Sequence, residues 1–194
     1  MDPEPSGMRS SLADALGHYR PSGGREQADA GRLLELIGTA ADPWSRSEPL
    51  HVTASALVAD ARSSRVLLRW HERFGRFQQV GGHADPGESD PLAVALREAR
   101  EETGLGDLRP AERPGRLRAG DLIHVVVVPV PAGDGERAHE HADLRYLLET
   151  GRAAQARAEK AGASVRWMSW DEALELAEED NLRELLRRAR DVLS

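Results

Sequence analysis

The sequence predicts an α+β fold: a mixed β-sheet sandwich with a helical extension at its N-terminal end. Three observations support this prediction. Strand patterns begin at residue 51 and mix with helices in no regular alternation, which does not fit a βα barrel. The first 47 residues show only helical patterns, and 194 residues suit one domain with an extension.

The composition narrows the classes of function. There are 33 acidic residues against 26 Lys and Arg, a net charge of -7, and no cysteine. Without cysteine there is no disulfide scaffold, no iron–sulfur cluster and no thiol nucleophile. The negative charge argues against DNA and membrane partners, because phosphate groups would repel it. The N-terminal residues lack a signal pattern, so we expect a cytoplasmic protein.

Two helices are expected before residue 48. The first runs from a cap at Ser10 or Ser11 through Tyr19. The second covers residues 25–37 and is expected to end at Gly38. Its apolar face is expected to hold Leu33, Leu34 and Ile37.

We therefore divide the chain into a helical extension, residues 1–47, and a main domain, residues 48–194. The extension is expected to pack on the main domain. A lid or a homodimer contact is the alternative.

β-branched and alternating residues predict the strands of the main domain. The expected strands cover residues 51–60, 65–69, 76–80, 121–130, 141–149 and 164–170. Residues 106–118 are expected to form an irregular connection, residues 133–135 a turn, and residues 152–163 a short helix or a loop. Ser169 and Glu172 resemble a capping box that opens a C-terminal helical region with a break near Asp180 and Asn181. Trp167 and Trp170 are expected to pack the last helix against the sheet.

Residues 81–105 have the pattern of a loop, a helix and a loop. Asp90 suits the N-cap and Pro91 the first helical position. The helix is expected to run to about Thr103 and to stop at Gly104 in a left-handed conformation.

This helix carries a cluster of three carboxylates. Glu98, Glu101 and Glu102 have i, i+3, i+4 spacing, which places their Cβ atoms about 5–6 Å apart. Clustered carboxylates repel one another unless a cation is present, and oxygen ligands suit Mg²⁺ or Mn²⁺. A solvated acidic face is the competing interpretation of these three residues alone.

The whole segment resembles the signature of the Nudix hydrolases, G-x5-E-x7-R-E-U-x-E-E-x-G-U, where U is a bulky apolar residue. The matching residues are Gly82, Glu88, Arg97, Glu98, Glu101, Glu102, Gly104 and Leu105. The sequence departs from the pattern twice. Eight residues separate Glu88 from Arg97, so strict spacing would select Ser89 instead, and Ala99 is small for its position.

The resemblance extends over about residues 48–194 and implies an α/β/α sandwich. It implies Mg²⁺-dependent (or Mn²⁺-dependent) hydrolysis of a nucleoside diphosphate linked to another group, by attack of water at phosphorus. The substrate is then a small nucleotide, with a nucleoside triphosphate as the generic expectation. A nucleotide-sensing module without turnover is the alternative.

The resemblance also implies roles for individual residues. Glu98, Glu101 and Glu102 would hold the metal together with a backbone carbonyl of Gly81 or Gly82. Arg97 would orient the carboxylates, Glu88 would support the site, and Glu98 is the first choice for the general base. Glu140 and Asp143 are the alternatives for the base, from a later part of the chain.

His139, His141 and Asp143 alternate, so a strand would place all three on one face. Three interpretations remain open for them. They form a transition-metal site, a strand end with hydrogen-bonded histidines, or part of the wall of the nucleotide pocket. The hydrogen-bonded arrangement is the favoured one, and His83 is expected to be a hydrogen-bonding loop residue.

Overall fold

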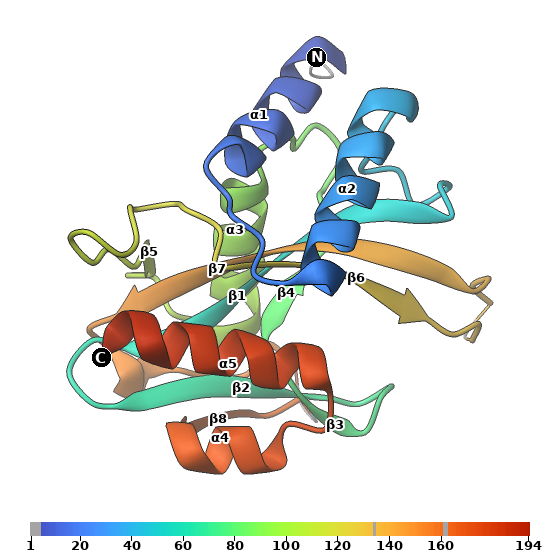
Figure 1. The fold of residues 1–194 in the computed structure, drawn as a ribbon. Coiled ribbons are helices and arrows are strands. Elements are labelled where there is room, and N and C mark those ends of the chain that lie inside the picture. Colours follow the sequence, from blue (N-terminus) through green and yellow to red (C-terminus); the bar gives the residue numbers. More distant parts are fainter. Residues whose placement is uncertain (1–4, 134, 161–162) are drawn as a thin grey trace.

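The computed structural model describes residues 5–133, 135–160 and 163–194, with side chains from residue 11 onward. Helices cover both faces of one eight-stranded mixed sheet (Figure 1). This arrangement confirms the predicted α/β/α sandwich with N-terminal helices. In the described ranges, none of the helices is long and apolar enough to cross a membrane.

The elements follow one another in this order: α1 Pro5–Gly17, α2 Gly24–Thr39, β1 Leu50–Asp60, β2 Arg65–His71, β3 Arg76–Gln78, β4 Val80–Gly82, α3 Pro91–Thr103, β5 Arg109–Pro110, β6 His124–Val130, β7 His139–Thr150, the 3₁₀ turn η1 Ala153–Gln155, β8 Val165–Ser169, α4 Trp170–Leu176 and α5 Asp180–Leu193.

Strands β1 and β7 form the centre of the sheet and run parallel. Their register extends from the pair Leu50–Glu140 to the pair Asp60–Thr150. All other pairings between named strands are antiparallel: β2 with β1, β3 and β8, β4 with β1, and β5 and β6 with β7. Both central strands are buried over most of their length, as parallel strands covered on two faces usually are.

The two faces of the sheet form two apolar cores. On one face, Ala54 and Ala56 of β1 pack with residues of α1, α2 and α3. On the other face, Leu57 and Ala59 of β1 pack with residues of α4 and α5. Alternation along β1 therefore directs neighbouring side chains to opposite helical layers.

The N-terminal helices are part of the first core. Leu12 of α1 and Leu33 of α2 are fully buried in it. The buried Glu26 of α2 accepts hydrogen bonds from Arg188 of α5 at 2.6 and 2.7 Å, which links the extension to the last helix. The extension thus packs on the main domain as expected. The division at residue 48 and a homodimer contact stay predictions.

Both N-terminal helices differ from their predicted ends. Helix α1 begins at Pro5, where a missing N–H costs little, and ends at Gly17. Tyr19 lies beyond this end, is buried, and its hydroxyl accepts the backbone N–H of Val125. Helix α2 continues through Gly38 to Thr39, whose hydroxyl donates to the carbonyl of Glu35.

One of the three residues predicted for the apolar face of α2 was wrong. Leu34 is exposed, and the buried apolar residues of this helix are Ala30, Leu33, Leu36 and Ile37. Trp170 packs with α5 as predicted, but Trp167 faces the opposite core and donates to the carbonyl of Ala153.

All six predicted strands are present with shifts at their ends, and the sheet has two strands more than predicted. The segment 76–80 divides at Gln79, because β3 pairs with β2 whereas β4 pairs with β1. The C-terminal helices separate just before Asp180, slightly earlier than predicted. In the connection 106–118, β5 adds a short pairing with β7. Asp134 of the predicted turn and residues 161–162 of the ambiguous segment 152–163 lie outside the described residues.

Candidate active site

Helix α3 has the local structure that its sequence predicts. The Asp90 side chain accepts the N–H of Leu92 at 2.9 Å, and Pro91 opens the helix. Gly104 ends it in the left-handed region with φ 66°. The buried Val94 and Ala99 join the first core, so the helix is fixed in rotation and presents its glutamates to β4.

Two glycines of β4 allow a close approach between strands and helix. Gly81 has φ 146°, and a Cβ there would lie 2.3 Å from the Cβ of Ser55 in β1. A Cβ on Gly82 would lie 2.8 Å from the carboxyl carbon of Glu98. A side chain at either position would therefore disturb the contact between β4 and its neighbours.

Glu102 is the most buried of the three glutamates. Its carboxylate accepts the N–H of Gly81 at 3.1 Å and forms an ion pair with Arg69 of β2 at 3.0 Å. Burial raises the pKa of Glu102 to about 7, because the charged form loses more hydration than Arg69 and the Gly81 N–H replace.

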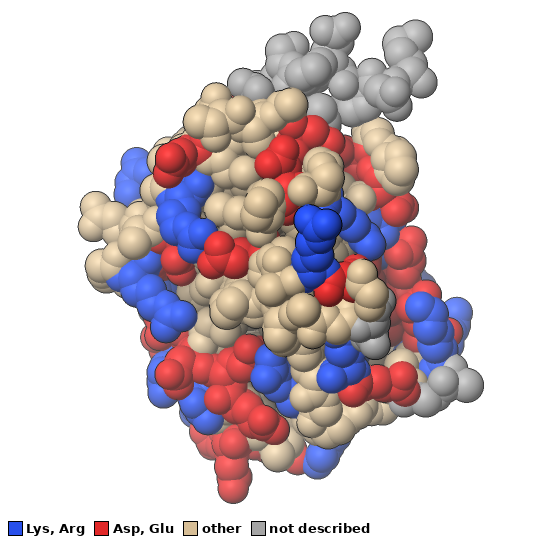
Figure 2. All heavy atoms as spheres, turned by 90° about the vertical axis from the view of Figure 1, so that its right-hand side faces the viewer, with Lys and Arg blue, Asp and Glu red and all other residues tan. Residues whose placement is uncertain are grey.

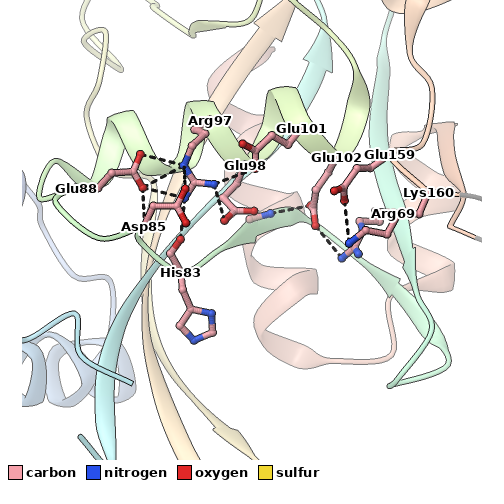
Figure 3. Close-up of polar contacts among 11 residues, drawn as sticks. Arg69, His83, Asp85, Glu88, Arg97, Glu98, Glu101, Glu102, Glu159 and Lys160 are labelled. Atoms are coloured by element: carbon pink, nitrogen blue, oxygen red, sulfur yellow. Dashed lines mark hydrogen bonds and ion pairs between the residues drawn. The ribbon is translucent and has the colours of Figure 1, made fainter. Parts of the chain in front are cut away.

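Arg97 connects the other carboxylates (Figure 3). One terminal nitrogen donates to Glu98 at 3.0 Å and to Glu101 at 2.9 Å. The other donates to the backbone carbonyl of His83 at 2.8 Å. Burial raises the pKa of Glu98 although Arg97 opposes the shift, while Glu101 is half exposed.

Glu88 contacts Arg97 despite the extra residue in the signature. Its two oxygens accept from the Arg97 Nε atom at 2.9 and 3.1 Å, and one also accepts the Asp85 N–H. Partial burial opposes ionisation, but these hydrogen bonds outweigh it and lower the pKa of Glu88. The added residue precedes α3, so the turn absorbs it and leaves Glu88 within reach of Arg97.

The donor set at this site suits a hard divalent cation. Glu98, Glu101 and Glu102 lie on one helix, and two of them have raised pKa values because burial penalises their negative charge. A divalent cation would relieve that penalty, and carboxylate and carbonyl oxygens are the ligands that Mg²⁺ and Mn²⁺ prefer. The residues therefore fit a divalent cation such as Mg²⁺ or Mn²⁺.

A cavity of about 220 Å³ opens beside the glutamates. Its wall includes Arg69, Gly81 and Gly82. The cavity therefore borders the guanidinium and the backbone N–H that Glu102 contacts, and the glycine against which the Glu98 carboxylate lies. Most of its other lining side chains are polar or charged, and Phe74 adds a phenyl ring. They include Phe74, Arg76, Gln78, Gln79, Arg145 and Glu179.

Both alternative base residues have polar partners outside α3. Glu140 is bound by Arg32 of α2, with a nearest N–O distance of 2.5 Å. Asp143 is buried and accepts hydrogen bonds from Thr53 at 3.1 Å, Ser55 at 2.8 Å and Arg145 at 2.7 Å. Asp143 borders the cavity, but its oxygens are occupied by these donors.

The alternating histidines lie on β7 as predicted, but their partners differ. The Nε2 atoms of His139 and His141 are 3.0 Å apart. Asp143 does not join them and belongs to the buried network with Arg145 instead. His51 of β1 and His83 after β4 complete the group, and His83 and His141 border the cavity.

Sequence reasoning missed Arg69, His51 and the cavity residues Gln79 and Arg145. Arg69 stands in a predicted strand, but nothing local shows that it reaches a carboxylate of α3. His51 meets His141 only because β1 and β7 run parallel in one register. A signal for that pairing would have to come from distant parts of the chain.

Comparison with known proteins defines the class. The family model of the NUDIX domain matches residues 49–189, and the chain therefore belongs to the Nudix family. The prediction of a Nudix hydrolase is confirmed at the level of the family.

Individual relatives agree with this assignment. A probable DHNTP pyrophosphohydrolase of Lactococcus lactis subsp. cremoris (strain MG1363) is 35% identical over 100 residues. The aligned part is 52% of this chain and only 54% of that relative, about half the length of each.

Solved structures share the fold. A NUDIX family hydrolase from Clostridium perfringens has a TM-score of 0.58 and 22% identity, covering 74% of this chain and 98% of its own. The dihydroneopterin triphosphate pyrophosphohydrolase of E. coli has a TM-score of 0.52 and 17% identity over 73% of this chain and 94% of its own. A C. elegans Ap4A hydrolase has a TM-score of 0.53 and 18% identity over 71% and 93%.

Proposed function

We propose that this protein is a Mg²⁺- or Mn²⁺-dependent pyrophosphohydrolase that cleaves a nucleoside diphosphate linked to another group. The observation that carries the proposal is the contact between α3 and β4. The buried Glu102 accepts the Gly81 N–H, and the Glu98 carboxylate lies against Gly82, at the wall of a polar cavity.

The three glutamates and Arg97 of α3 each have a role in this proposal. Glu98, Glu101 and Glu102 would hold the cation with a carbonyl of Gly81 or Gly82. A bound Mg²⁺ supplies positive charge for the phosphates and lowers the pKa of the attacking water. Arg97 keeps the carboxylates of Glu98 and Glu101 in place through its 3.0 and 2.9 Å hydrogen bonds.

Glu98 is our choice for the general base. Water attacks phosphorus, a P–O anhydride bond breaks, the leaving phosphate departs with the bonding electrons, and the water proton passes to the Glu98 carboxylate. The raised pKa of Glu98, caused first by burial, makes it a better proton acceptor than an exposed glutamate.

The cavity supports a compact polar substrate. Among the described residues, the buried polar atoms without a hydrogen-bond partner include Nδ1 of His71 and Nε of Arg76, and both residues line the cavity. Phe74 offers a ring on which a base could stack. Nucleoside triphosphates and the pterin triphosphate suggested by the relatives' names fit this class. Action in the cytoplasm is part of the same proposal.

A panel of nucleoside triphosphates, dihydroneopterin triphosphate, dinucleoside polyphosphates and nucleotide sugars tests the proposal, with release of phosphate or pyrophosphate as the readout. We expect activity that requires Mg²⁺ or Mn²⁺ and stops on chelation. Glu101→Gln and Glu102→Gln should each lower kcat/KM by at least about 100-fold, since loss of a group that only holds a metal ligand in place already costs about 10–100-fold.

Glu175→Gln is the matched control, because Glu175 is an exposed glutamate on another helix. Full activity in both site variants, or activity that survives chelation, contradicts the mechanism. Tight nucleotide binding without turnover of any panel member would favour the nucleotide-sensing module.

A further inference from the structure

Four histidines from three separate segments meet at one end of the sheet. His51 stands on β1, His83 directly follows β4, and His139 and His141 stand on β7. The ring centroids of His51 lie 5.1, 5.2 and 5.0 Å from those of His83, His139 and His141. Such convergence requires the parallel register of β1 and β7 and is not a property of any one strand.

The ring nitrogens of this cluster are oriented toward one another. Nδ1 of His51 lies 3.0 Å from the carbonyl of Glu48, and Nδ1 of His139 lies 2.8 Å from the carbonyl of Arg137. A carbonyl only accepts, so both Nδ1 atoms donate, and in the neutral form of each ring, which is the form that binds a metal, Nε2 keeps a lone pair. These lone pairs point to the neighbours: Nε2 of His51 is 3.0 Å from Nε2 of His83.

We propose that His51, His83 and His141 bind a divalent transition-metal ion of the zinc type, with His139 beside them as a further imidazole ligand. One ligand nitrogen from each of the three residues lies within 4.8 Å of the other two. Tetrahedral zinc with Zn–N bonds of about 2.0–2.1 Å needs nitrogens about 3.3–3.4 Å apart, so small side-chain rotations suffice.

The chemistry of the cluster matches this ion and differs from that of the glutamate site. Neutral imidazole suits Zn²⁺, Co²⁺, Ni²⁺ and Cu²⁺, whereas carboxylates and carbonyls suit Mg²⁺. The carbonyls behind His51 and His139 are the usual outer partners of ligating histidines, because they fix the tautomer and the ring direction. Burial lowers the pKa of His83 to about 3 and of His141 to about 4, which keeps both rings in the ligating form.

The position of His83 connects this second ion to the proposed active site. Its ring belongs to the cluster, while its backbone carbonyl accepts a hydrogen bond from Arg97 at 2.8 Å. An ion on the histidines would join β1, β7 and the loop that begins after Gly82. We infer a structural role for it: it anchors the loop between β4 and α3, and it raises stability through binding to the folded state only.

The test uses the full chain without a histidine tag, in excess Mg²⁺ so that the carboxylate site is occupied. One equivalent of Co²⁺ is added and visible absorption reports its coordination, and zinc content is then measured by mass spectrometry after dialysis against zinc and buffer. The variants are His51→Ala and His141→Ala. His18→Ala, an exposed histidine outside the cluster, and Glu101→Gln, at the carboxylate site, are the controls.

We expect about one zinc per chain, intense tetrahedral Co²⁺ bands and a higher unfolding midpoint with zinc in the wild type and in both controls. His51→Ala and His141→Ala should lose at least about tenfold in zinc affinity together with the zinc-dependent shift of the midpoint. If either fails to fold, as judged by circular dichroism, His139→Ala and His83→Ala replace it.

Two results would overturn the proposal. Zinc content and Co²⁺ bands unchanged in the cluster variants would place the ion elsewhere. No zinc binding by the wild type in excess Mg²⁺ would leave the four rings as a hydrogen-bonded packing arrangement. Neither result bears on hydrolysis, which depends on the glutamates of α3.

Discussion

Asp143→Asn should lower the free energy of unfolding by about 3–5 kcal/mol, because it removes one charge of a buried ion pair. Asp143 and Arg145 are both nearly inaccessible, and the Arg145 Nε atom donates to the carboxylate at 2.7 Å. The side-chain amide of Asn keeps the shape and one acceptor oxygen. The destabilisation therefore comes mainly from the Arg145 guanidinium, which stays buried without a carboxylate to neutralise its charge.

Removing the second charge should restore most of that loss. In the double variant Asp143→Asn with Arg145→Met no unpaired charge remains, and replacement of a whole buried pair by apolar groups is often nearly neutral. The size of the recovery measures the coupling between the two residues, since they are in direct contact.

Urea unfolding followed by circular dichroism, with chelator present, measures these changes. Asp180→Asn is the control: Asp180 pairs with Arg183 at 2.9 Å but is largely exposed, so its loss should cost no more than about 1 kcal/mol. Equal costs for Asp143→Asn and Asp180→Asn, or additive costs in the double variant, would refute the reasoning.

The same variant separates two roles for Asp143. As a structural anion it should leave kcat of the folded enzyme within a few-fold of the wild type. If Asp143 were the general base, its substitution would lower kcat by about 10²–10⁴-fold even when the variant is fully folded. We expect the first result, because donors from Thr53, Ser55 and Arg145 occupy its oxygens.

Two further predictions concern the backbone of β4 and a buried histidine. Gly81→Ala should destabilise the fold by about 2–4 kcal/mol, because Gly81 has a positive φ and an added Cβ would clash with Ser55. Gly106→Ala is the control: the space around Gly106 is open, so this change should affect the melting temperature little. Equal melting temperatures for the two variants would contradict the prediction. Burial lowers the pKa of His124 to about 2, so below about pH 6.5 only the unfolded chain binds this proton. Wild-type stability should therefore fall relative to His124→Asn by about 1.4 kcal/mol per pH unit as the pH drops from 6.5 toward 3; parallel stability curves would exclude it.

Short sequence patterns predicted those features of the site that lie within one helix. Asp90, Pro91 and Gly104 fix the ends of α3, and the spacing of its glutamates then follows from helix geometry alone. The extra residue before the helix did not separate Glu88 from Arg97, because a turn absorbs length without rotating the helix.

The remaining features depend on pairing between distant segments. The parallel register of β1 and β7 brings His51 to His141, and no pattern within either strand encodes its partner. Arg69 reaches Glu102 for the same reason, across the contact of β2, β1 and β4 with α3. The partners of Glu140 and Asp143 also come from distant segments: Arg32 of α2 binds Glu140, and Thr53 and Ser55 of β1 donate to Asp143, which the pattern of β7 alone does not show.

Charge arithmetic at the proposed active site points to a divalent ion. Four glutamates, at positions 88, 98, 101 and 102, and Asp85 pair with two arginines, Arg69 and Arg97. With all seven ionised, the group carries a charge of -3. Figure 2 shows acidic and basic side chains interspersed over one face of the molecule, and charges exposed in this way are hydrated and need no counterion. At the partly buried glutamates, hydration is reduced, and this desolvation is the main cause of the raised pKa of Glu102 and Glu98, with a smaller contribution from neighbouring carboxylates. A divalent cation would balance this charge and also bind the phosphates that the chain's net charge of -7 would otherwise repel.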